Sequence, residues 1–131
     1  MESDKKYLIV GLGNPGKEYA LNRHNSGFIV LDTLGEKHNG EFRTDKKMSY
    51  SEILSNEKRV ILLKPLEYMN LSGNAVTQML SKNGIHSSQM LVIHDEIDIP
   101  FGEVRMKFGG GHAGHNGLRN IIDRIGTKDF H

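Results

Sequence analysis

The side chains suited to acid–base chemistry gather in short polar stretches between apolar runs. His24 stands in Asn22-Arg23-His24-Asn25, and Asp95 follows the apolar run that ends at Ile93. An imidazole titrates near neutral pH and can take a proton from water, while a carboxylate can orient the imidazole and stabilise its charged form. The sequence has no cysteine and no G-x-S-x-G motif. This inventory favours hydrolysis by activated water over a covalent intermediate.

Three asparagines supply neutral donors in similar stretches: Asn14, Asn70 and Asn116. Ester hydrolysis develops negative charge on the carbonyl oxygen, and an amide donor placed there is worth about 3–4 kcal/mol. An amide can also hold a peptide group without bringing charge. For Asn70 and Asn116 the alternative is a helix N-cap, and both roles can coexist.

A glycine-rich turn, Gly11-Leu12-Gly13-Asn14-Pro15-Gly16, follows the apolar run Leu8–Val10 and matches the letters of a dinucleotide-binding motif. Pro15 supplies no backbone N–H, and no helical stripe follows until Phe28. Asp32, at the distance expected for a ribose-binding acid, falls inside a predicted helix. We therefore interpret the turn as presenting Asn14 at the carboxyl edge of a sheet, where α/β folds build their sites.

The elements that must position these residues alternate along the chain. Apolar runs predict strands at Leu8–Val10, Val60–Leu63 and Leu91–Ile93, alternation predicts one at Glu103–Phe108, and a weaker signal marks Met48–Leu54. Helical spacing predicts helices within Asn25–Lys37, over Ser72–Asn83 before Gly84, and from a cap at Asn116 to a stop at Gly126. This order predicts an α/β fold: one domain over residues 1–131, with a twisted, mostly parallel mixed sheet and helices packed on its faces.

Composition narrows the function classes. The chain of 131 residues is 37% hydrophobic and 25% charged, which is typical of a soluble globular domain. Its net charge is +1, so any site for a polyanion must be a local patch. No apolar run reaches the length of a membrane span, and the N-terminus lacks a signal-peptide core. We expect a cytoplasmic protein that does not contact a membrane.

Five blocks together resemble the bacterial peptidyl-tRNA hydrolase family: GLGNPGKEY, NRHNSG, YMNLSG, HDEIDIPFG and GGGHAGHNGL, in this order and spacing. The resemblance implies an enzyme that cleaves the ester between peptide and tRNA and releases tRNA for reuse in translation. It also implies a monomer that needs no cofactor or metal. The family continues for several dozen residues beyond the point that matches His131, with a core strand and a basic lid segment, so we expect that this C-terminal segment is absent here.

The resemblance also implies roles for individual residues. His24 matches the catalytic base, Asp95 its orienting carboxylate, and Asn14 and Asn116 complete the catalytic set. Contacts to the peptide, to the 3′ CCA end and to the acceptor stem fall on Tyr19, Tyr68, Met69, Asn70, His115, Asn116, Arg105 and Lys107. For the tyrosines and Met69 the alternative is simple packing. For Arg105 and Lys107 it is a solvated sheet face.

Two rival functions remain open on the sequence. His112 and His115 form an H-x-x-H that could ligate zinc together with His94 or Asp95. Some plant relatives of the family keep the fold but serve RNA splicing by binding a partner protein. Retention of His24, Asp95 and the three asparagines favours the enzyme.

Overall fold

The computed structural model describes residues 5–13, 26–68, 71–94, 106–109 and 115–131. The elements in chain order are β1 (Lys6–Gly11), α1 (Ser26–Lys37), β2 (Arg43–Thr44), β3 (Met48–Ser55), β4 (Lys58–Pro65), α2 (Ser72–Asn83), the 3-10 turn η5 (Ser87–Gln89), β5 (Met90–Ile93) and α3 (Asn116–Ile125). The three predicted helices are confirmed, as are the strands predicted from apolar runs and the weaker strand at β3. None of the described helices is long and apolar enough to cross a membrane.

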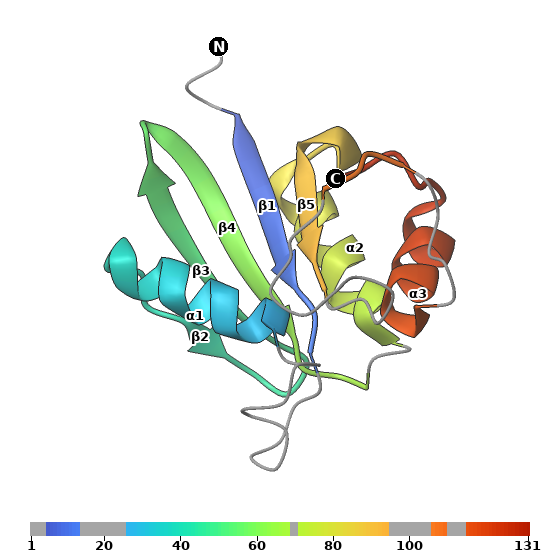
Figure 1. Cartoon of the computed structure of the whole chain (residues 1–131), viewed down its shortest axis with the longest axis horizontal. Helices are drawn as coiled ribbons and strands as arrows, with labels where there is room; N and C mark the ends of the chain where they lie inside the picture. The colour runs from blue at the N-terminus through green and yellow to red at the C-terminus, as the bar shows by residue number, and fades with distance from the viewer. Residues whose placement is uncertain (1–4, 14–25, 69–70, 95–105, 110–114) are drawn as a thin grey trace.

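One sheet organises these elements, with the strand order β2-β3-β4-β1-β5 (Figure 1). β1 lies between β4 and β5 and runs parallel to both. β3 is antiparallel to β4 and to β2, so the sheet is mixed, as the predicted fold class requires. α1 covers one face of the sheet, while α2 and α3 pack on the other (Figure 1).

Alternate residues of the central strands pack into two cores on opposite faces. Leu8 and Val10 of β1 are fully buried in the larger core with α2 and α3. Leu62 of β4 is fully buried in the smaller core, where it joins Leu31 of α1. Burying such a side chain contributes roughly 1.5–3 kcal/mol. Coverage of both faces explains why these strands are continuous apolar runs in the sequence.

A two-residue turn joins β3 to β4. Ser55 pairs with Lys58, and the residues between them, Asn56 and Glu57, have φ values of 51° and 68°. Positive φ at both central residues marks the type I′ turn, whose twist matches that of the strands it connects. Asparagine tolerates this conformation well, whereas glutamate does not.

The prediction of a strand at Glu103–Phe108 is wrong for the part that the structure describes. Residues 106–108 are not in a strand, and Met106 and Phe108 are 73% and 54% exposed rather than turned together toward a core. The ring of Phe108 lies 4.9 Å from that of His131, centroid to centroid. Phe108 thus contacts the end of the chain, and residues 106–108 pair with no strand. An alternating pattern indicates which side chains share a face, but it does not supply a neighbouring strand for the backbone hydrogen bonds.

The last residues of the chain lie along the outer edge of β5. The backbone N–H of His131 donates to the carbonyl of Met90 at 3.1 Å, and the N–H of Val92 donates to the carbonyl of His131 at 2.8 Å. This is the hydrogen-bond pattern of a parallel pair. Phe130 is buried in the larger core. Phe130 and His131 are therefore held by backbone hydrogen bonds to β5 as well as by packing in the core.

Candidate active site

The carboxyl ends of β1 and β5 meet the start of α1. Just past β1, the N–H of Leu12 donates to the carbonyl of Ile93 at 2.9 Å. A Cβ added to Gly27, in the first turn of α1, would lie 2.5 Å from the backbone N and O of Leu12 and 2.6 Å from the carbonyl oxygen of Ile93. Only glycine permits this approach, so the helix start is held against both strand ends.

Three of the four predicted catalytic residues lie close in the sequence to Leu12, Gly27 and Ile93, the residues that make these contacts. Asn14 follows Gly13, His24 precedes Ser26 by two positions, and Asp95 follows His94. Asn14, His24 and Asp95 lie outside the described residues, so their mutual geometry remains a prediction. The segments that lead to them do come together, as the contacts of Gly27 require.

The start of α3 is capped by a histidine. The Nδ1 atom of His115 accepts hydrogen bonds from the backbone N–H groups of Gly117 and Leu118, at 3.1 and 3.2 Å. An acceptor at Nδ1 requires the neutral tautomer with its proton on Nε2. The prediction that Asn116 caps this helix is therefore wrong. The backbone is extended at His115 and already helical at Asn116, whose side chain is exposed.

The same histidine places the start of α3 beside the end of β5. The rings of His115 and His94 lie 4.8 Å apart, centroid to centroid, at an interplanar angle of 63°. Asn116 thus stands at the positive end of a helix dipole, near the strand end that precedes Asp95. Such a position favours negative charge, which the carbonyl oxygen of an ester acquires during hydrolysis.

A second helix start is tied to α3. The side-chain oxygen of Asn120 accepts a hydrogen bond from the backbone N–H of Gly73 at 2.7 Å. The N-cap residue of α2 is Leu71, which makes no side-chain cap. The N-cap position of α2 therefore falls one residue after Asn70, the residue for which capping was the alternative. Asn70 and Met69 lie outside the described residues.

Of the remaining residues predicted to contact the substrate, the structure describes two, and two lie outside the described residues. Tyr68 is 80% exposed, so the packing alternative is wrong for its ring, which stands open to a ligand. Lys107 is exposed beside Met106 and Phe108, so these residues do not form a one-sided sheet face. Tyr19 and Arg105 lie outside the described residues.

The zinc alternative gains no support from the part of the chain that the structure describes. No group of three or more His, Cys, Asp or Glu side chains there is placed to hold a metal ion. His112 and Asp95, two of the ligands considered, lie outside it. His115 uses Nδ1 for its helix cap, which leaves Nε2 as its only nitrogen for other contacts.

Sequence reasoning missed the residues that position the helices: Gly27, Gly73 and Asn120. The two glycines each follow a serine at the start of a predicted helix, within the blocks NRHNSG and YMNLSG. Glycine so early in a helix is a signal for close approach of backbones. Asn120 carries no comparable signal, because its partner is 47 positions away in the sequence.

Asp32 has a local structural role. Its carboxylate lies in α1 and forms an ion pair with Lys64 of β4, across the face that α1 covers. It is not at the end of a strand. This agrees with our rejection of the dinucleotide interpretation.

Comparison with known proteins gives consistent results. The family model described as peptidyl-tRNA hydrolase matches residues 8–131. The curated peptidyl-tRNA hydrolase of Frankia alni is 46% identical over 128 residues, and that of Sorangium cellulosum is 48% identical over 124 residues. These alignments cover 97% and 94% of this chain but 65% and 56% of the relatives, so the chain spans about two thirds or less of their length.

A solved structure gives the same result for the fold. The crystal structure of peptidyl-tRNA hydrolase from Acinetobacter baumannii superposes with a TM-score of 0.91 at 41% identity. The superposition covers 100% of this chain and 66% of that one.

Proposed function

The chain belongs to the peptidyl-tRNA hydrolase family, and from this premise we propose that it hydrolyses the ester bond between peptide and tRNA in peptidyl-tRNA. The product is free tRNA for reuse in translation and in ribosome recycling. The observation that carries the proposal is the family match over residues 8–131, which includes every predicted catalytic residue.

In the proposed mechanism, His24 removes a proton from the water that attacks the ester carbonyl. Asp95 accepts a hydrogen bond from the other ring nitrogen and stabilises the imidazolium. Asn14 holds the peptide, and Asn116 orients the water or the developing oxyanion. The contacts of Gly27 support this mechanism. The first turn of α1, which follows His24, touches the end of β5, which precedes Asp95.

The proposed substrate contacts lie around these groups. Tyr19, Tyr68, Met69, Asn70 and His115 contact the peptide and the 3′ CCA end of the tRNA, and Arg105 and Lys107 contact phosphates of the acceptor stem. The exposure of Tyr68 and Lys107 supports this assignment. We propose further that the 131 residues form one peptidyl-tRNA hydrolase domain that works as a cytoplasmic monomer without a cofactor.

The test is release of the acyl group from an N-blocked aminoacyl-tRNA, run beside the unblocked form. We expect release from the blocked substrate alone, and a loss of about 10²-fold or more in His24→Ala. His38→Ala is the matched control, because His38 follows the far end of α1. Equal loss in both variants would contradict the role of His24.

The same assay separates the enzyme from a silent binding relative. The relatives are longer than this chain. The assay is therefore repeated on a fusion that carries the C-terminal third of a relative. No release by either protein, when both are folded and bind tRNA, would favour the binding function. Release by either one supports the enzyme.

A further inference from the structure

The hydrogen bond from Gly73 to Asn120 joins two helices that both begin beside predicted site residues. Asn116 is the first residue of α3 and lies about one turn, or about 6 Å along the helix axis, before Asn120. Gly73 is the second residue of α2 and follows Asn70 by three positions. A single side chain therefore links the start of α3, proposed to act on the ester, with the start of α2, which follows proposed contacts to the tRNA end.

The two helices also touch closely at this hydrogen bond. A Cβ added to Gly73 would lie 2.7 Å from both the carbonyl oxygen and the side-chain oxygen of Asn120, and 2.8 Å from the Cγ of Arg124. Glycine at this position lets the start of α2 lie directly against α3. Asn120 is half-buried, so its hydrogen bond is partly shielded from water and is stronger for it.

Asn120 holds its oxygen in a fixed place on α3. Leu118 and Ile121, which flank it in the sequence, are buried in the larger core. The ring of His115 caps the first turn of the same helix. The start of α2 is thus bonded to a part of α3 that is held by packing and by a cap.

Short-range hydrogen bonds carry this attachment on to Tyr68. The backbone N–H of Leu71 donates to the carbonyl of Tyr68 at 2.7 Å. The side-chain amide of Asn74, in the first turn of α2, donates to the carboxylate of Glu67 at 3.4 Å. The residues that lead into α2 are therefore bonded to it, and a shift of Gly73 would move Tyr68, whose ring is 80% exposed.

We propose that Asn120 is a positioning residue for substrate binding. Its hydrogen bond to Gly73 sets the place of the segment that carries Tyr68 and Asn70 relative to Asn116 at the start of α3. The role rests on the proposed hydrolysis of peptidyl-tRNA, which makes both segments part of one site. Asn120 acts through Gly73 and contacts no substrate itself.

The experiment measures binding of an analogue that is not turned over. The probe is an RNA minihelix with a CCA end whose 3′ ribose carries N-acetylphenylalanine through an amide in place of the ester. We expect Asn120→Ala to raise Kd for this probe about tenfold, because the segment before α2 is no longer held in place. Asn120→Asp keeps the acceptor oxygen and should stay within about twofold of the parent protein.

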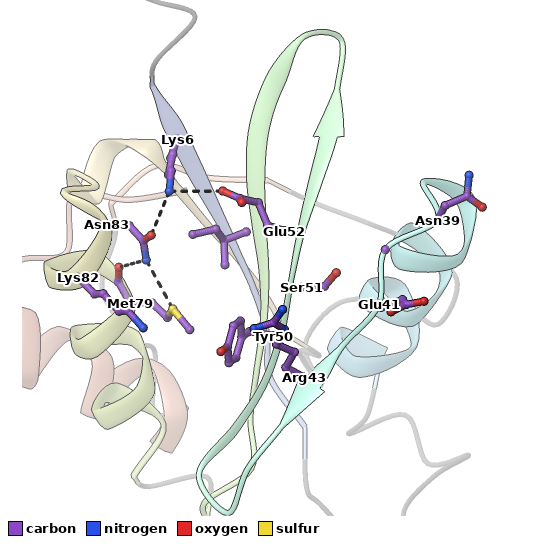
Figure 2. A pocket seen from close by; sticks show the side chains of 12 residues that line it. Lys6, Asn39, Glu41, Arg43, Tyr50, Ser51, Glu52, Met79, Lys82 and Asn83 are labelled. Atoms are coloured by element: carbon purple, nitrogen blue, oxygen red, sulfur yellow. Dashed lines mark hydrogen bonds and ion pairs between the residues drawn. The ribbon is translucent and has the colours of Figure 1, made fainter.

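The matched control is Asn83→Ala at the other end of α2. The side chain of Asn83 accepts a hydrogen bond from Lys6 at 3.3 Å and donates to the carbonyl of Met79 at 3.0 Å (Figure 2). It lies ten residues after Gly73, about 15 Å along the helix. Asn83→Ala should lose stability and leave Kd unchanged, with thermal unfolding confirming that each variant is folded in the assay. An equal rise in Kd for both variants would overturn the proposal.

A double-variant comparison separates positioning from a general structural role. Tyr68→Ala should by itself raise Kd about tenfold. Adding Asn120→Ala to it should raise Kd little further, because the ring that Asn120 positions is already gone. Adding Asn120→Ala to Lys107→Ala, on a different segment, should multiply the two losses. Losses that multiply with both partners would show that Asn120 does not act through Tyr68.

Hydrolysis of the ester substrate is measured beside binding, so that the two proposals fail separately. A parent protein that binds the amide probe but does not hydrolyse the ester would contradict the proposed function, and the Kd values would still decide the role of Asn120. An unchanged Kd in Asn120→Ala, with normal hydrolysis by the parent, would overturn the positioning role alone. No binding of the probe by the parent would overturn both.

Discussion

The side-chain oxygen of Asn120 on α3 accepts a hydrogen bond from the backbone N–H of Gly73 at 2.7 Å, and so caps a neighbouring helix that has no cap of its own. We expect Asn120→Ala to lower the free energy of unfolding by about 1–2 kcal/mol, because a first-turn N–H loses its partner. Denaturant unfolding measures this. Asn120→Asp keeps the acceptor beside a positive helix end and should retain most of the stability. Equal loss in both variants would show that packing matters more than the cap.

Gly27 allows α1 to touch two strand ends, and a side chain there should force them apart. Gly27→Ala places a Cβ within 2.6 Å of three backbone atoms of Leu12 and Ile93. We expect a loss of about 3 kcal/mol in the free energy of unfolding, together with loss of ester hydrolysis. The matched control is Glu36→Ala on an exposed position of α1, which should change stability by less than about 0.5 kcal/mol. A stable and active Gly27→Ala would contradict the proposed anchoring.

His115 is expected to have two separable roles. His115→Ala should cost about 1 kcal/mol of stability, because the N–H groups of Gly117 and Leu118 lose their acceptor. His115→Asn restores a good capping side chain and should restore the stability. If the ring also contacts substrate, KM for N-blocked aminoacyl-tRNA rises in both variants. A KM that recovers together with stability would leave His115 with the cap alone.

Glu57 is an unfavourable residue at a left-handed position, and glycine should suit the turn better. We expect Glu57→Gly to raise the free energy of unfolding by about 1 kcal/mol, because φ is 68° there and glycine adopts this value without steric cost. Chemical denaturation measures the difference. Lys58→Gly, one residue later and within β4, should instead destabilise the protein. Stabilisation by both changes would point to an effect other than the turn.

Asp45 should make stability depend on pH. Its carboxylate accepts hydrogen bonds from the backbone N–H groups of Lys47 and Met48, at 2.7 and 2.9 Å, and these lower the pKa of Asp45 below its ordinary value. A carboxyl with a lowered pKa stabilises the fold above its ordinary pKa, and the contribution disappears as pH falls through the lowered value. Asp45→Asn should therefore melt at a lower temperature at neutral pH.

The difference in melting temperature between Asp45→Asn and the parent protein should shrink as pH falls through the acid range. Thermal unfolding from neutral to acidic pH checks this. Asp123→Asn, on an exposed position of α3, is the comparison for a general effect of lost charge. A difference for Asp45→Asn that stays constant at every pH would contradict the role of its ionised form.

The elements predicted correctly are those whose residues carry a strong local pattern. Continuous apolar runs found β1, β4 and β5, because strands covered on both faces cannot be polar. The stripe Leu118, Ile121, Ile122 and Ile125 found α3. β2 was not predicted, because a strand of two residues is too short to show an apolar run or an alternation.

The errors and omissions arise where the backbone conformation or a distant partner decides the structure, and not the residue types alone. Asparagine is the better capping type, yet His115 holds the cap because the extended backbone falls one residue earlier than predicted. Met106 and Phe108 alternate with charges, but residues 106–108 pair with no strand. The contact of Asn120 with Gly73 depends on how two helices cross, which no local pattern encodes.

The central place of β1 also has a consequence for synthesis on the ribosome. β3 and β4 are joined by two residues and can pair as soon as both have emerged. Among the described strands β1 emerges before β3 and β4, but its two neighbours come much later in the chain, and closing such long loops is entropically costly. We therefore expect the hairpin to form first and β1 to stay unpaired on its β5 side until Ile93 has been made. The earliest of these strands then keeps one open edge until β5, the last of them, completes the sheet.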